Sequence, residues 1–548
     1  MAITLNDLWR ETVDRFPDHD YLSLFGRTVT YTKVDRESRK FANFLRCQGL
    51  RPGDRVMLLM PNCPQMAIAC WGIWRAGCVM TALNPLLTSS ELVEMARLVE
   101  PSLFVTLKDL DAHNRALVPN LPSDCATMMV GLEAYLPPIM SVLYRLKTLV
   151  TKRNPSYQFT WSSIRDSECS SYTFEDLPKP DDLAVLQFTG GTTGSVKAAM
   201  LTHANLVANT EQAMDLVGKV IDENSVIFSA IPCFHVYGLS VCLVLAASRG
   251  AKVVMVPKFM DRNKVMKDGK EVTIATINKE VFRIFKEDCI TLLPGIPNIF
   301  AALIDDKRFR DLDIEHMRLC VSGSGALNQE VKRNFQAWAG CEIIEGYGLS
   351  ETSPIVSINP PGRALPGSLG IPVRDTEIRI VPEPDAKLED GGELWVRGPQ
   401  VMKGYWENEE ATKDVLTPDG WLKTGDMVIQ VGEHLVMTDR KKDMIKVSGE
   451  NVYPSEIEKI LLEKLGVAEA YVVGVPDDKS GERVVACLVP QDGTRNFSLE
   501  EVRAACGGLS KIKIPKEVWN FSKDQIPRTY LGKVQKKELR KMLTKTPS

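Results

Sequence analysis

The sequence predicts an α/β protein, in which a large N-terminal domain of layered α/β subdomains and a small barrel-like subdomain precede a small α+β C-terminal domain. Three observations carry this prediction: apolar runs that alternate with helical stretches, later strands between glycine and proline turns, and a change of texture after Asp439. The chain of 548 residues also exceeds the roughly 100 to 200 residues of a single domain, so several folded units are expected.

The apolar runs are rich in valine and isoleucine and do not alternate with polar residues, which is typical of strands covered on both faces. They lie at residues 55–60, 103–107, 183–188 and 251–256. Because helical stretches separate them, they predict α/β layering.

Three further strand-like runs, at residues 377–381, 392–398 and 434–439, predict a more antiparallel, barrel-like subdomain. A charged turn follows, then a short strand, a helix that begins near Pro454 and another strand. The remaining stretch, roughly a hundred residues, is long enough for an independent domain. We therefore place a boundary between residues 439 and 442, with an N-terminal domain at 1–439 and a C-terminal domain at 440–548.

Composition excludes some classes of protein. With 44% hydrophobic residues, 25% charged residues and a net charge of -3, the chain lacks the strongly basic footprint of a nucleic-acid-binding protein. The thirteen cysteines include no CxxC pair, which predicts reduced thiols in a cytoplasmic protein. The charged residues Asp7, Arg10, Glu11 and Asp14 argue against a signal peptide.

Two apolar stretches bear on membrane contact. Residues 226–248 are uncharged, but Pro232 and Gly238 favour a buried strand, loop and helix over a membrane span. Residues 137–153 form an amphipathic helix with only positive charges, which either packs on its own domain, the commoner case, or lies peripherally on an anionic membrane. Its predicted apolar face consists of Ile139, Val142, Leu143, Leu146, Leu149 and Val150.

Residues 186–203, LQFTGGTTGSVKAAMLTH, combine glycines, hydroxyl residues and a lysine between an apolar run and a helix that Thr202 would cap. Glycines let successive backbone N–H groups form an anion-binding concavity, and Lys197 adds a positive charge. The loop is therefore predicted to hold a phosphate, with an ordinary turn as the alternative. A P-loop is excluded, because Lys197 does not directly follow Gly194 and no hydroxyl residue follows Lys197.

Six motifs in order resemble those of the adenylate-forming enzymes. They are TGGTTGSVKAAMLTH, PCFHVYG, EGYGLSETSP, GWLKTGDM, DRKKDMIKVSGENVYPSEIE and PRTYLGKVQKKELR. They look most like those of bacterial-type long-chain fatty acid CoA ligases. The resemblance implies a mobile C-terminal domain, the cofactors ATP, Mg²⁺ and coenzyme A, and a fatty acid substrate that is converted to acyl-AMP with release of pyrophosphate and then to acyl-CoA.

The same resemblance implies how ATP is bound. The loop residues that would hold the β- and γ-phosphates are Thr189, Gly190, Gly191, Thr192, Thr193, Gly194 and Lys197. The remaining ATP-site residues would be Tyr347 at adenine with Gly348 beside it, Asp426 at the ribose hydroxyls, Arg440 near the ribose or phosphate, Thr352 at the α-phosphate and Glu351 at Mg²⁺.

For catalysis, the resemblance implies that Lys533 bridges the carboxylate and the α-phosphate; the alternative is one solvated lysine in a basic stretch. His235 would position the substrate and not act as a base, because the substrate is already a carboxylate; the alternative is a satisfied core histidine. The acyl pocket would include Phe234, Tyr237, Gly323 and Gly325, and its glycines are otherwise tight packing positions.

The thioester step would need the C-terminal domain to turn about the hinge residue Lys442. This turn would bring Lys446 and Gly449 toward the active site for the reaction with coenzyme A. The alternative is that residues 446–451, KVSGEN, form only a turn at the end of a strand.

The sequence departs from the family pattern at two places. Ala198 stands where most relatives have glycine, and we expect its methyl group to crowd the loop unless the local φ is negative. Residues 261–280 are longer and more charged than a connection requires, and we expect a surface excursion without an assigned function.

Other functions remain open. Within the family, these are an acyl-AMP ligase that serves a carrier protein and a ligase that joins an aryl or other carboxylic acid to CoA. Outside it, the chain would be a catalytically weak membrane-surface or partner-binding protein, which the retention of Lys533, Asp426, Arg440 and Glu351 argues against. A homodimer is expected by analogy only.

Overall fold

The computed structural model describes residues 3–150, 157–166, 177–189, 196–267, 270–382, 391–447, 450–477, 480–491, 495–528 and 534–545. The chain divides into two compact units. Unit 1 consists of residues 1–377 and 397–420, and unit 2 consists of residues 378–396 and 421–548.

The first sheet of unit 1 has seven strands in the order β7-β6-β5-β3-β4-β8-β9. Their bounds are β3 (Arg55–Leu59), β4 (Val79–Ala82), β5 (Leu103–Leu107), β6 (Ala126–Val130), β7 (Phe159–Thr160), β8 (Leu183–Thr189) and β9 (Lys197–Thr202). All neighbours are parallel except β8 and β9. The predicted strands at 55–60, 103–107 and 183–188 are confirmed as β3, β5 and β8. Unbroken apolar runs of this kind form strands that are covered on both faces.

The second sheet of unit 1 has nine strands in the order β18-β17-β16-β15-β14-β10-β11-β1-β2. Their bounds are β1 (Asp20–Leu24), β2 (Arg27–Thr30), β10 (Val226–Ser229), β11 (Lys252–Met255), β14 (Leu292–Gly295), β15 (Leu319–Ser322), β16 (Ile343–Gly348), β17 (Ile355–Ile358) and β18 (Ile371–Pro372). The strands from β16 to β1 in this order pair in parallel, and antiparallel strands close both ends. The carboxyl ends of its parallel strands therefore share one edge, where sheets of this kind commonly bind ligands.

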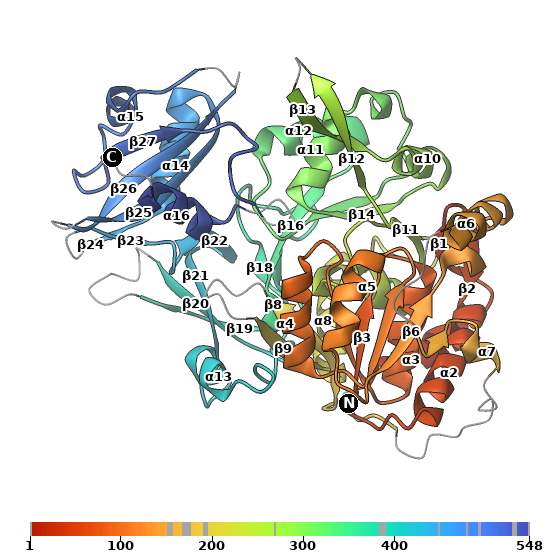
Figure 1. The fold of residues 1–548 in the computed structure, drawn as a ribbon. Coiled ribbons are helices and arrows are strands. Elements are labelled where there is room, and N and C mark those ends of the chain that lie inside the picture. Colours follow the sequence, from red (N-terminus) through yellow and green to blue (C-terminus); the bar gives the residue numbers. More distant parts are fainter. Residues whose placement is uncertain are drawn as a thin grey trace. The chain divides into compact units, whose positions relative to one another are not determined.

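Helices cover both sheets of unit 1 (Figure 1). The helices of unit 1 are α1 (Leu5–Arg15), α2 (Tyr31–Cys47), α3 (Pro64–Arg75), α4 (Ser89–Val99), α5 (Asp111–Leu117), α6 (Pro138–Val150), α7 (Ser163–Asp166), α8 (His203–Val217), α9 (Ala246–Arg249), α10 (Lys279–Glu287), α11 (Pro297–Asp305), α12 (Gln329–Ala339) and α13 (Glu409–Val415), and not all of them lie on a sheet. Short 3₁₀ turns lie at Val118–Asn120, Leu132–Ala134, Lys307–Phe309 and Ser350–Thr352, and a π-helix, η3, spans Gly238–Leu245.

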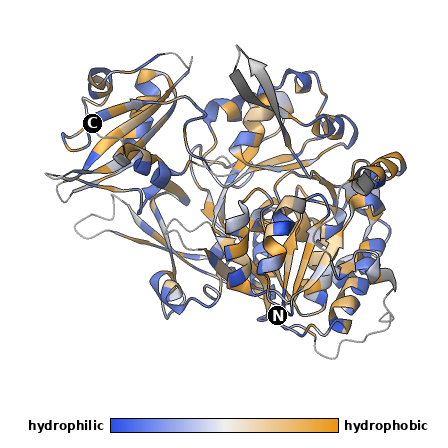
Figure 2. Cartoon of the chain, in the orientation of Figure 1, coloured by the Kyte–Doolittle hydropathy of each residue, from blue (hydrophilic) through white to orange (hydrophobic). Residues whose placement is uncertain are grey.

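Two apolar cores fix these layers. Residues of α4 and α5, such as Leu92, Val99 and Leu117, pack on the seven-stranded sheet. Residues of α10, α11 and α12, such as Phe285, Phe300 and Phe335, pack on the nine-stranded sheet. The central strands are coloured as hydrophobic in Figure 2. The uncharged run at 226–248 is a buried strand, loop and helix, as predicted.

The charged excursion at 261–280 contains a two-stranded hairpin. It is formed by β12 (Met260–Lys267) and β13 (Lys270–Ile277), which pair antiparallel with each other and with neither larger sheet. The sequence prediction recognised an excursion but not its strands, because charged residues interrupt the apolar pattern of a strand.

The amphipathic stretch at 137–153 contains α6, whose apolar face is exposed. Ile139, Val142, Leu143 and Leu146 are 77%, 56%, 60% and 55% exposed, respectively. The expectation that this face packs on its own domain is wrong for these four side chains, and those of Leu149 and Val150 lie outside the description. Among the described residues, no helix is both long and apolar enough to cross a bilayer.

Unit 2 contains two sheets. The first has the order β19-β20-β21-β22, with β19 (Glu377–Val381), β20 (Gly392–Arg397), β21 (Leu422–Val431) and β22 (His434–Arg440). These are the three strands predicted for the small subdomain together with β21, and β20, β21 and β22 pair antiparallel as expected.

The second sheet of unit 2 has the order β24-β23-β26-β25, with β27 pairing to β26. Its elements are β23 (Ile445–Val447), β24 (Glu450–Val452), β25 (Val467–Asp477), β26 (Gly481–Pro490), β27 (Glu517–Asn520), α14 (Pro454–Leu465), α15 (Leu499–Ala505) and α16 (Lys536–Lys545). Residues of α14 and α15 pack with the sheet in one apolar cluster. Residues of α16 pack with it in a second apolar cluster. The helix predicted near Pro454 is confirmed.

The cysteines mostly match the sequence prediction. Among the described residues, eleven cysteines carry free thiols, and nine of these are buried. The prediction of reduced thiols is wrong for Cys47, which is disulfide-bonded.

Buried His203 makes stability depend on pH. Its Nδ1 accepts a hydrogen bond from Leu5 N–H at 3.4 Å, and Nε2 has no partner. Burial lowers the pKa of His203 to about 4, although Asp182 and Asp7 act in the opposite direction. Because an unfolded histidine has a pKa of about 6.5, the unfolded chain takes up a proton first as the pH falls, and stability is lost between about pH 6.5 and pH 4.

We therefore expect the free energy of unfolding to fall by about 2 kcal/mol between pH 7.5 and pH 5 through this residue alone. Urea unfolding of the wild type and His203→Asn at both pH values measures this difference. The exposed His19→Gln variant is the matched control. Equal pH dependence in the wild type and His203→Asn would contradict the assignment.

Candidate functional site

The glycine-rich stretch lies between two paired strands of unit 1. β8 and β9 pair antiparallel, so that Thr189 lies opposite Lys197 at the base of the loop. The loop residues outside the description are Gly190, Gly191, Thr192, Thr193 and Gly194, and their phosphate-binding roles stay predictions.

Thr202 caps α8 as predicted, since its hydroxyl accepts a hydrogen bond from Asn205 N–H at 3.0 Å. However, strand β9 separates the loop from this helix. Any phosphate in the loop would therefore depend on loop N–H groups and on Lys197, and not on the dipole of α8.

Ala198 is accommodated in β9. Its side chain is fully buried in an apolar cluster that includes Phe188 and Met200. Ala198 has no positive φ, so the methyl group creates no backbone strain. Of the two outcomes expected from the sequence, crowding of the loop or accommodation at a negative φ, the structure favours accommodation.

Residues 403–406, which include Tyr405 and Trp406, run beside β9. Met200 N–H donates to the Gly404 carbonyl at 2.9 Å, and Trp406 N–H donates to the Ala198 carbonyl at 2.8 Å. This pairing brings the ring of Tyr405 close to Lys197, with Nζ of the lysine 5.1 Å from the ring centroid.

Tyr405 connects two predicted site residues. Its hydroxyl donates a hydrogen bond to Oε1 of Glu351 at 2.8 Å, while its ring lies against Lys197. Burial, followed by the Glu351 carboxylate, raises the pKa of Tyr405 above its usual value, so the phenol stays protonated as a donor. Sequence reasoning missed Tyr405, although it stands in the stretch RGPQVMKGYW. The signal available in the sequence was a pair of aromatic residues directly after Gly404.

The turn that carries Glu351 is tightly bonded. The hydroxyl of Thr352 lies 2.6 Å from the carbonyl oxygen of Pro354 and 3.1 Å from that of Leu349, and it accepts from Leu349 N–H at 3.1 Å. Thr352 is fully buried. Contact with an α-phosphate would therefore require the hydroxyl to exchange one of these acceptors for the phosphate.

Tyr347 and Gly348 occupy the end of β16, where the strand pairs antiparallel with β17. A Cβ atom at Gly348 would lie only 1.9 Å from the carbonyl oxygen of Pro354. Only glycine permits this approach between the strand end and the Glu351 turn. Tyr347 and Gly348 of the predicted ATP site and Glu351, the predicted Mg²⁺ residue, thus share one hairpin.

His235 lies in the loop between β10 and the π-helix. Its Nδ1 accepts a hydrogen bond from Tyr237 N–H at 3.1 Å. Loss of hydration in this partly enclosed position lowers the pKa of His235 to about 4. The imidazole is therefore neutral at pH 7, which suits the predicted positioning role.

Three of the four predicted acyl-pocket residues meet the ends of the parallel strands. The hydroxyl of Tyr237 donates to the Val321 carbonyl at 3.0 Å, and a Cβ at Gly323 would lie 3.1 Å from its ring. Gly325 lies beyond it, with Pro297 as its neighbour. Phe234 is buried, and its carbonyl accepts from Gln187 at the end of β8.

In unit 2, Asp426 and Arg440 face each other across β21 and β22. Nε of Arg440 is 3.2 Å from Oδ1 of Asp426, whose side chain is 3% exposed. The neighbouring Glu393 accepts from Gly425 N–H at 3.2 Å and pairs with Lys441 at 3.0 Å. These contacts fix the Thr-Gly-Asp turn. Glu393 was not identified as a site residue from the sequence.

The predicted hinge residue Lys442 lies in a turn after β22. N–H groups of Asp443 and Met444 both donate to the Arg440 carbonyl, at 2.9 and 3.2 Å. Lys446 is exposed on β23, and its N–H donates to Glu482 at 2.7 Å. Gly449 lies outside the described residues.

Lys533 also lies outside the described residues, but the chain on both sides of it is anchored. Arg528 pairs with Glu469, and Lys536 pairs with Glu458 at 2.7 Å. Lys536 is mostly buried, with a side chain that is 17% exposed. Lys536 is therefore not a solvated surface lysine, and the role of Lys533 stays a prediction.

No group of three or more histidine, cysteine, aspartate or glutamate side chains that could hold a metal ion occurs among the described residues. Glu351 provides a single carboxylate with one oxygen bound by Tyr405. Mg²⁺ is commonly held by one or two carboxylates together with substrate phosphates and water, so this donor set fits Mg²⁺ delivered with a nucleotide.

Comparison with known proteins agrees with this geometry. The AMP-binding enzyme family matches residues 9–406, and the AMP-binding enzyme C-terminal domain matches residues 456–533. The chain is 36% identical over 547 residues to a long-chain-fatty-acid–CoA ligase from Bacillus subtilis (strain 168), with 98% of this chain and 94% of the relative covered. It is 34% identical to a protein of the same name from Escherichia coli O157:H7, with the same coverage. The solved structure of ATP-bound MatB from Rhodopseudomonas palustris is 26% identical over 99% of both chains, with a TM-score of 0.82.

Proposed function

The chain belongs to the AMP-binding enzyme family, and from this membership we propose that it is an AMP-forming ligase that joins a long-chain fatty acid to coenzyme A. A carboxylate is a poor electrophile, so the acid must first be activated. One carboxylate oxygen attacks the α-phosphorus of ATP, and pyrophosphate leaves. The thiol of coenzyme A then attacks the acyl carbon, AMP leaves, and the thiol proton passes to solvent.

In the first step, charge develops on the phosphate oxygens, and fixed cations and donors stabilise it. We assign the β- and γ-phosphates to Lys197 and the loop that begins at Thr189. Glu351 would hold Mg²⁺, which neutralises phosphate charge. Thr352 would bind the α-phosphate, and Lys533 would bridge it to the carboxylate.

The remaining roles follow the sequence predictions. Tyr347 would bind adenine with Gly348 beside it, and Asp426 would accept hydrogen bonds from the ribose hydroxyls near Arg440. The neutral His235 would orient the acid, with Phe234, Tyr237, Gly323 and Gly325 at the acyl chain.

The second step is assigned to a turn about Lys442 that exchanges Lys533 for Lys446 and Gly449. In this proposal, residues 1–439 form the adenylation domain and residues 440–548 the mobile domain. The proposed hinge lies in the short turn in which Asp443 and Met444 N–H donate to the Arg440 carbonyl, and hinges absorb a backbone change at few residues.

One observation supports the proposal most directly: Tyr405 contacts both Lys197 and Glu351. The proposed β,γ-phosphate cation and the proposed Mg²⁺ ligand are thereby brought to one side chain. Glu351 would hold a Mg²⁺ ion that neutralises charge on the phosphates of ATP, and Lys197 would bind phosphates of the same nucleotide, so these two side chains need to lie close together.

Mass spectrometry of the products formed from Mg-ATP and palmitate, with and without coenzyme A, tests the function. Palmitoyl-CoA with AMP is the expected result. Palmitoyl-AMP that persists with coenzyme A would indicate a carrier-protein acceptor. Turnover of aryl acids alone would indicate an aryl-acid CoA ligase, and no pyrophosphate release with any acid would indicate a binding protein.

We also propose that α6 contacts an anionic membrane surface. The protein would then be cytoplasmic and bound peripherally to a membrane. Five of the ten large hydrophobic side chains that are exposed among the described residues lie on this helix, including Ile139 and Leu143. Arg145 and Lys147 supply positive charge, and α6 carries no acidic residue. An exposed apolar face with basic flanks complements anionic lipid headgroups and the acyl region beneath them.

Substituting three α6 residues tests this contact. The variant Val142→Ser/Leu143→Ser/Leu146→Ser is expected to lose at least about tenfold in affinity for phosphatidylglycerol vesicles, because burial of even one leucine contributes about 1.5 to 3 kcal/mol. Vesicle co-sedimentation measures the affinity. Leu86→Ser, which removes another exposed apolar side chain outside α6, is the matched control.

Sedimentation velocity without lipid separates the predicted homodimer from the membrane contact. A dimer that is lost in the α6 variant, together with unchanged vesicle binding, would assign this face to a second copy of the chain and overturn the membrane proposal.

A further inference from the structure

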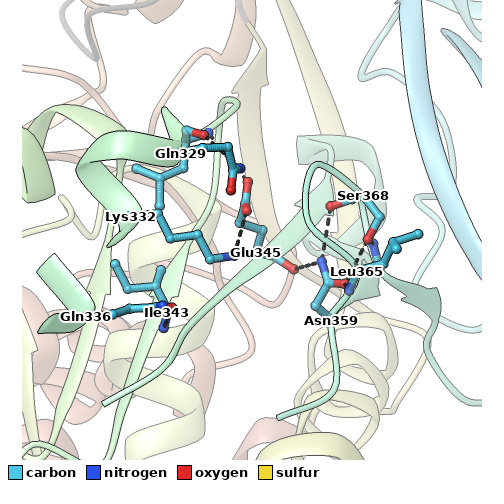
Figure 3. A network of polar contacts seen from close by, with 10 residues as sticks. Gln329, Lys332, Gln336, Ile343, Glu345, Asn359, Leu365 and Ser368 are labelled. Carbon is cyan, nitrogen blue, oxygen red and sulfur yellow. Dashed lines mark hydrogen bonds and ion pairs between the residues drawn. The ribbon is translucent and has the colours of Figure 1, made fainter. Parts of the chain in front are cut away.

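A largely buried ion pair joins α12 to β16 in unit 1. Nζ of Lys332 is 3.0 Å from Oε1 of Glu345, and the two side chains are 11% and 12% exposed. One turn further along α12, Oε1 of Gln336 accepts from Ile343 N–H at 2.9 Å. Figure 3 shows both contacts, through which one helix face holds one strand at two points.

Glu345 also links to the backbone on either side of it. Its Oε2 accepts from Leu327 N–H at 3.5 Å. Its carbonyl accepts from the N–H of Asn359 at 2.9 Å and from the Asn359 side-chain amide at 3.2 Å. Asn359 is buried and is itself held by Ser368 and Leu365 (Figure 3).

Glu345 occupies the point where β16 leaves the parallel sheet. It pairs with Ser322 of β15, and the next residue, Gly346, already pairs antiparallel with Ile358 of β17. On one side the chain continues from Ser322 to Gly323 and Gly325 of the proposed acyl pocket. On the other side, two residues along β16, stands Tyr347 of the proposed adenine site.

The pair is not explained by stability alone. Burying two charges costs desolvation energy, and a well-packed apolar pair often stabilises a fold equally well. Buried ion pairs are retained in some proteins because they fix one geometry. Here the ion pair would fix the spacing between the segment that follows β15 and the hairpin formed by β16 and β17.

We propose that Lys332 and Glu345 form a positioning pair that sets the distance between the acyl-pocket segment and the adenine strand, and thereby aligns the carboxylate with the α-phosphorus. The inference rests on the proposed function. Both residues act through Tyr347 and the Gly323 segment and do not touch the reacting atoms.

Separate half-reactions test this role. Misalignment by about 1 Å can cost on the order of 100-fold in rate, while each substrate binds nearly as before. For Lys332→Met, we expect kcat of pyrophosphate release to fall about 10- to 100-fold, with KM for ATP and for palmitate within about threefold of wild type. Thioester formation from supplied palmitoyl-AMP should be nearly unchanged, because its carboxyl and phosphate are already joined.

Two variants and a control complete the test. Lys332→Arg, which keeps the charge, should restore most of kcat, and the isosteric Glu345→Gln should reproduce the loss if Lys332→Met does not fold. Lys413→Met, which breaks the exposed Lys413–Glu409 pair, is the control.

The outcomes are distinct. Equal loss of both half-reactions, or unchanged kcat of pyrophosphate release in Lys332→Met and Glu345→Gln, would overturn the positioning role while leaving the proposed function intact. A wild-type enzyme that releases no pyrophosphate would refute the proposed function, and the positioning role with it.

Discussion

Replacing Lys533 with alanine is expected to slow adenylate formation by about 100- to 1000-fold, because the variant loses the cation proposed to bridge the carboxylate and the α-phosphate. The thioester step should be spared, since the proposed turn of the C-terminal domain removes Lys533 before coenzyme A reacts. Pyrophosphate release measures the first step, and formation of palmitoyl-CoA from supplied palmitoyl-AMP measures the second.

The matched control for Lys533→Ala is Lys541→Ala on the same basic stretch. Lys541 is 54% exposed and pairs only with Glu538 among the described contacts, so its loss should leave both steps unchanged. Equal loss of both steps in Lys533→Ala would contradict separate roles for the two half-reactions. An unaffected first step would return Lys533 to the class of solvated surface lysines.

The Glu351→Gln variant is expected to lower the rate of adenylate formation by about 100-fold, because an amide is a weaker ligand for Mg²⁺ and leaves phosphate charge uncompensated. The Mg²⁺ concentration that gives half-maximal rate should rise at the same time. A magnesium titration of pyrophosphate release, at saturating ATP and palmitate, measures both quantities.

Tyr405→Phe provides a graded comparison for Glu351→Gln. It removes the hydrogen bond to Glu351 but keeps the ring beside Lys197, so the rate should fall by less than in Glu351→Gln. Glu409→Gln, at an exposed carboxylate, is the control. If Glu351→Gln lowers the rate without changing the magnesium dependence, Glu351 acts on the turn of Thr352 and not on the metal.

Much of the fold could be predicted because its strands are buried on both faces. Such strands have an unbroken apolar pattern, and the runs that became β3, β5, β8 and β11 stood out for this reason. β9 was missed because its short run follows directly on the glycine loop and Lys197. β12 and β13 were missed because their charged sequence carries no burial pattern.

The candidate site was predicted through motifs that are local in sequence. The contacts of Glu351 with Tyr405 and of Glu345 with Lys332 join distant or differently patterned segments, so they depend on the fold itself. The same limit applies to α6. Its amphipathic pattern predicted the helix, but whether neighbouring elements cover its apolar face is a property of tertiary packing.

The β8–β9 hairpin has a consequence for how such enzymes diverge. A loop between two paired strands is anchored by cross-strand hydrogen bonds at its base, here at Thr189 and Lys197. Insertions or deletions at its tip leave the register below unchanged, and α8 begins only after six further residues of strand. The fold should therefore tolerate changes of loop length between residues 190 and 195 far better than equal changes within β9, where a one-residue slip would reverse every side chain that follows. Such length changes would act on phosphate binding while leaving the strands below in place.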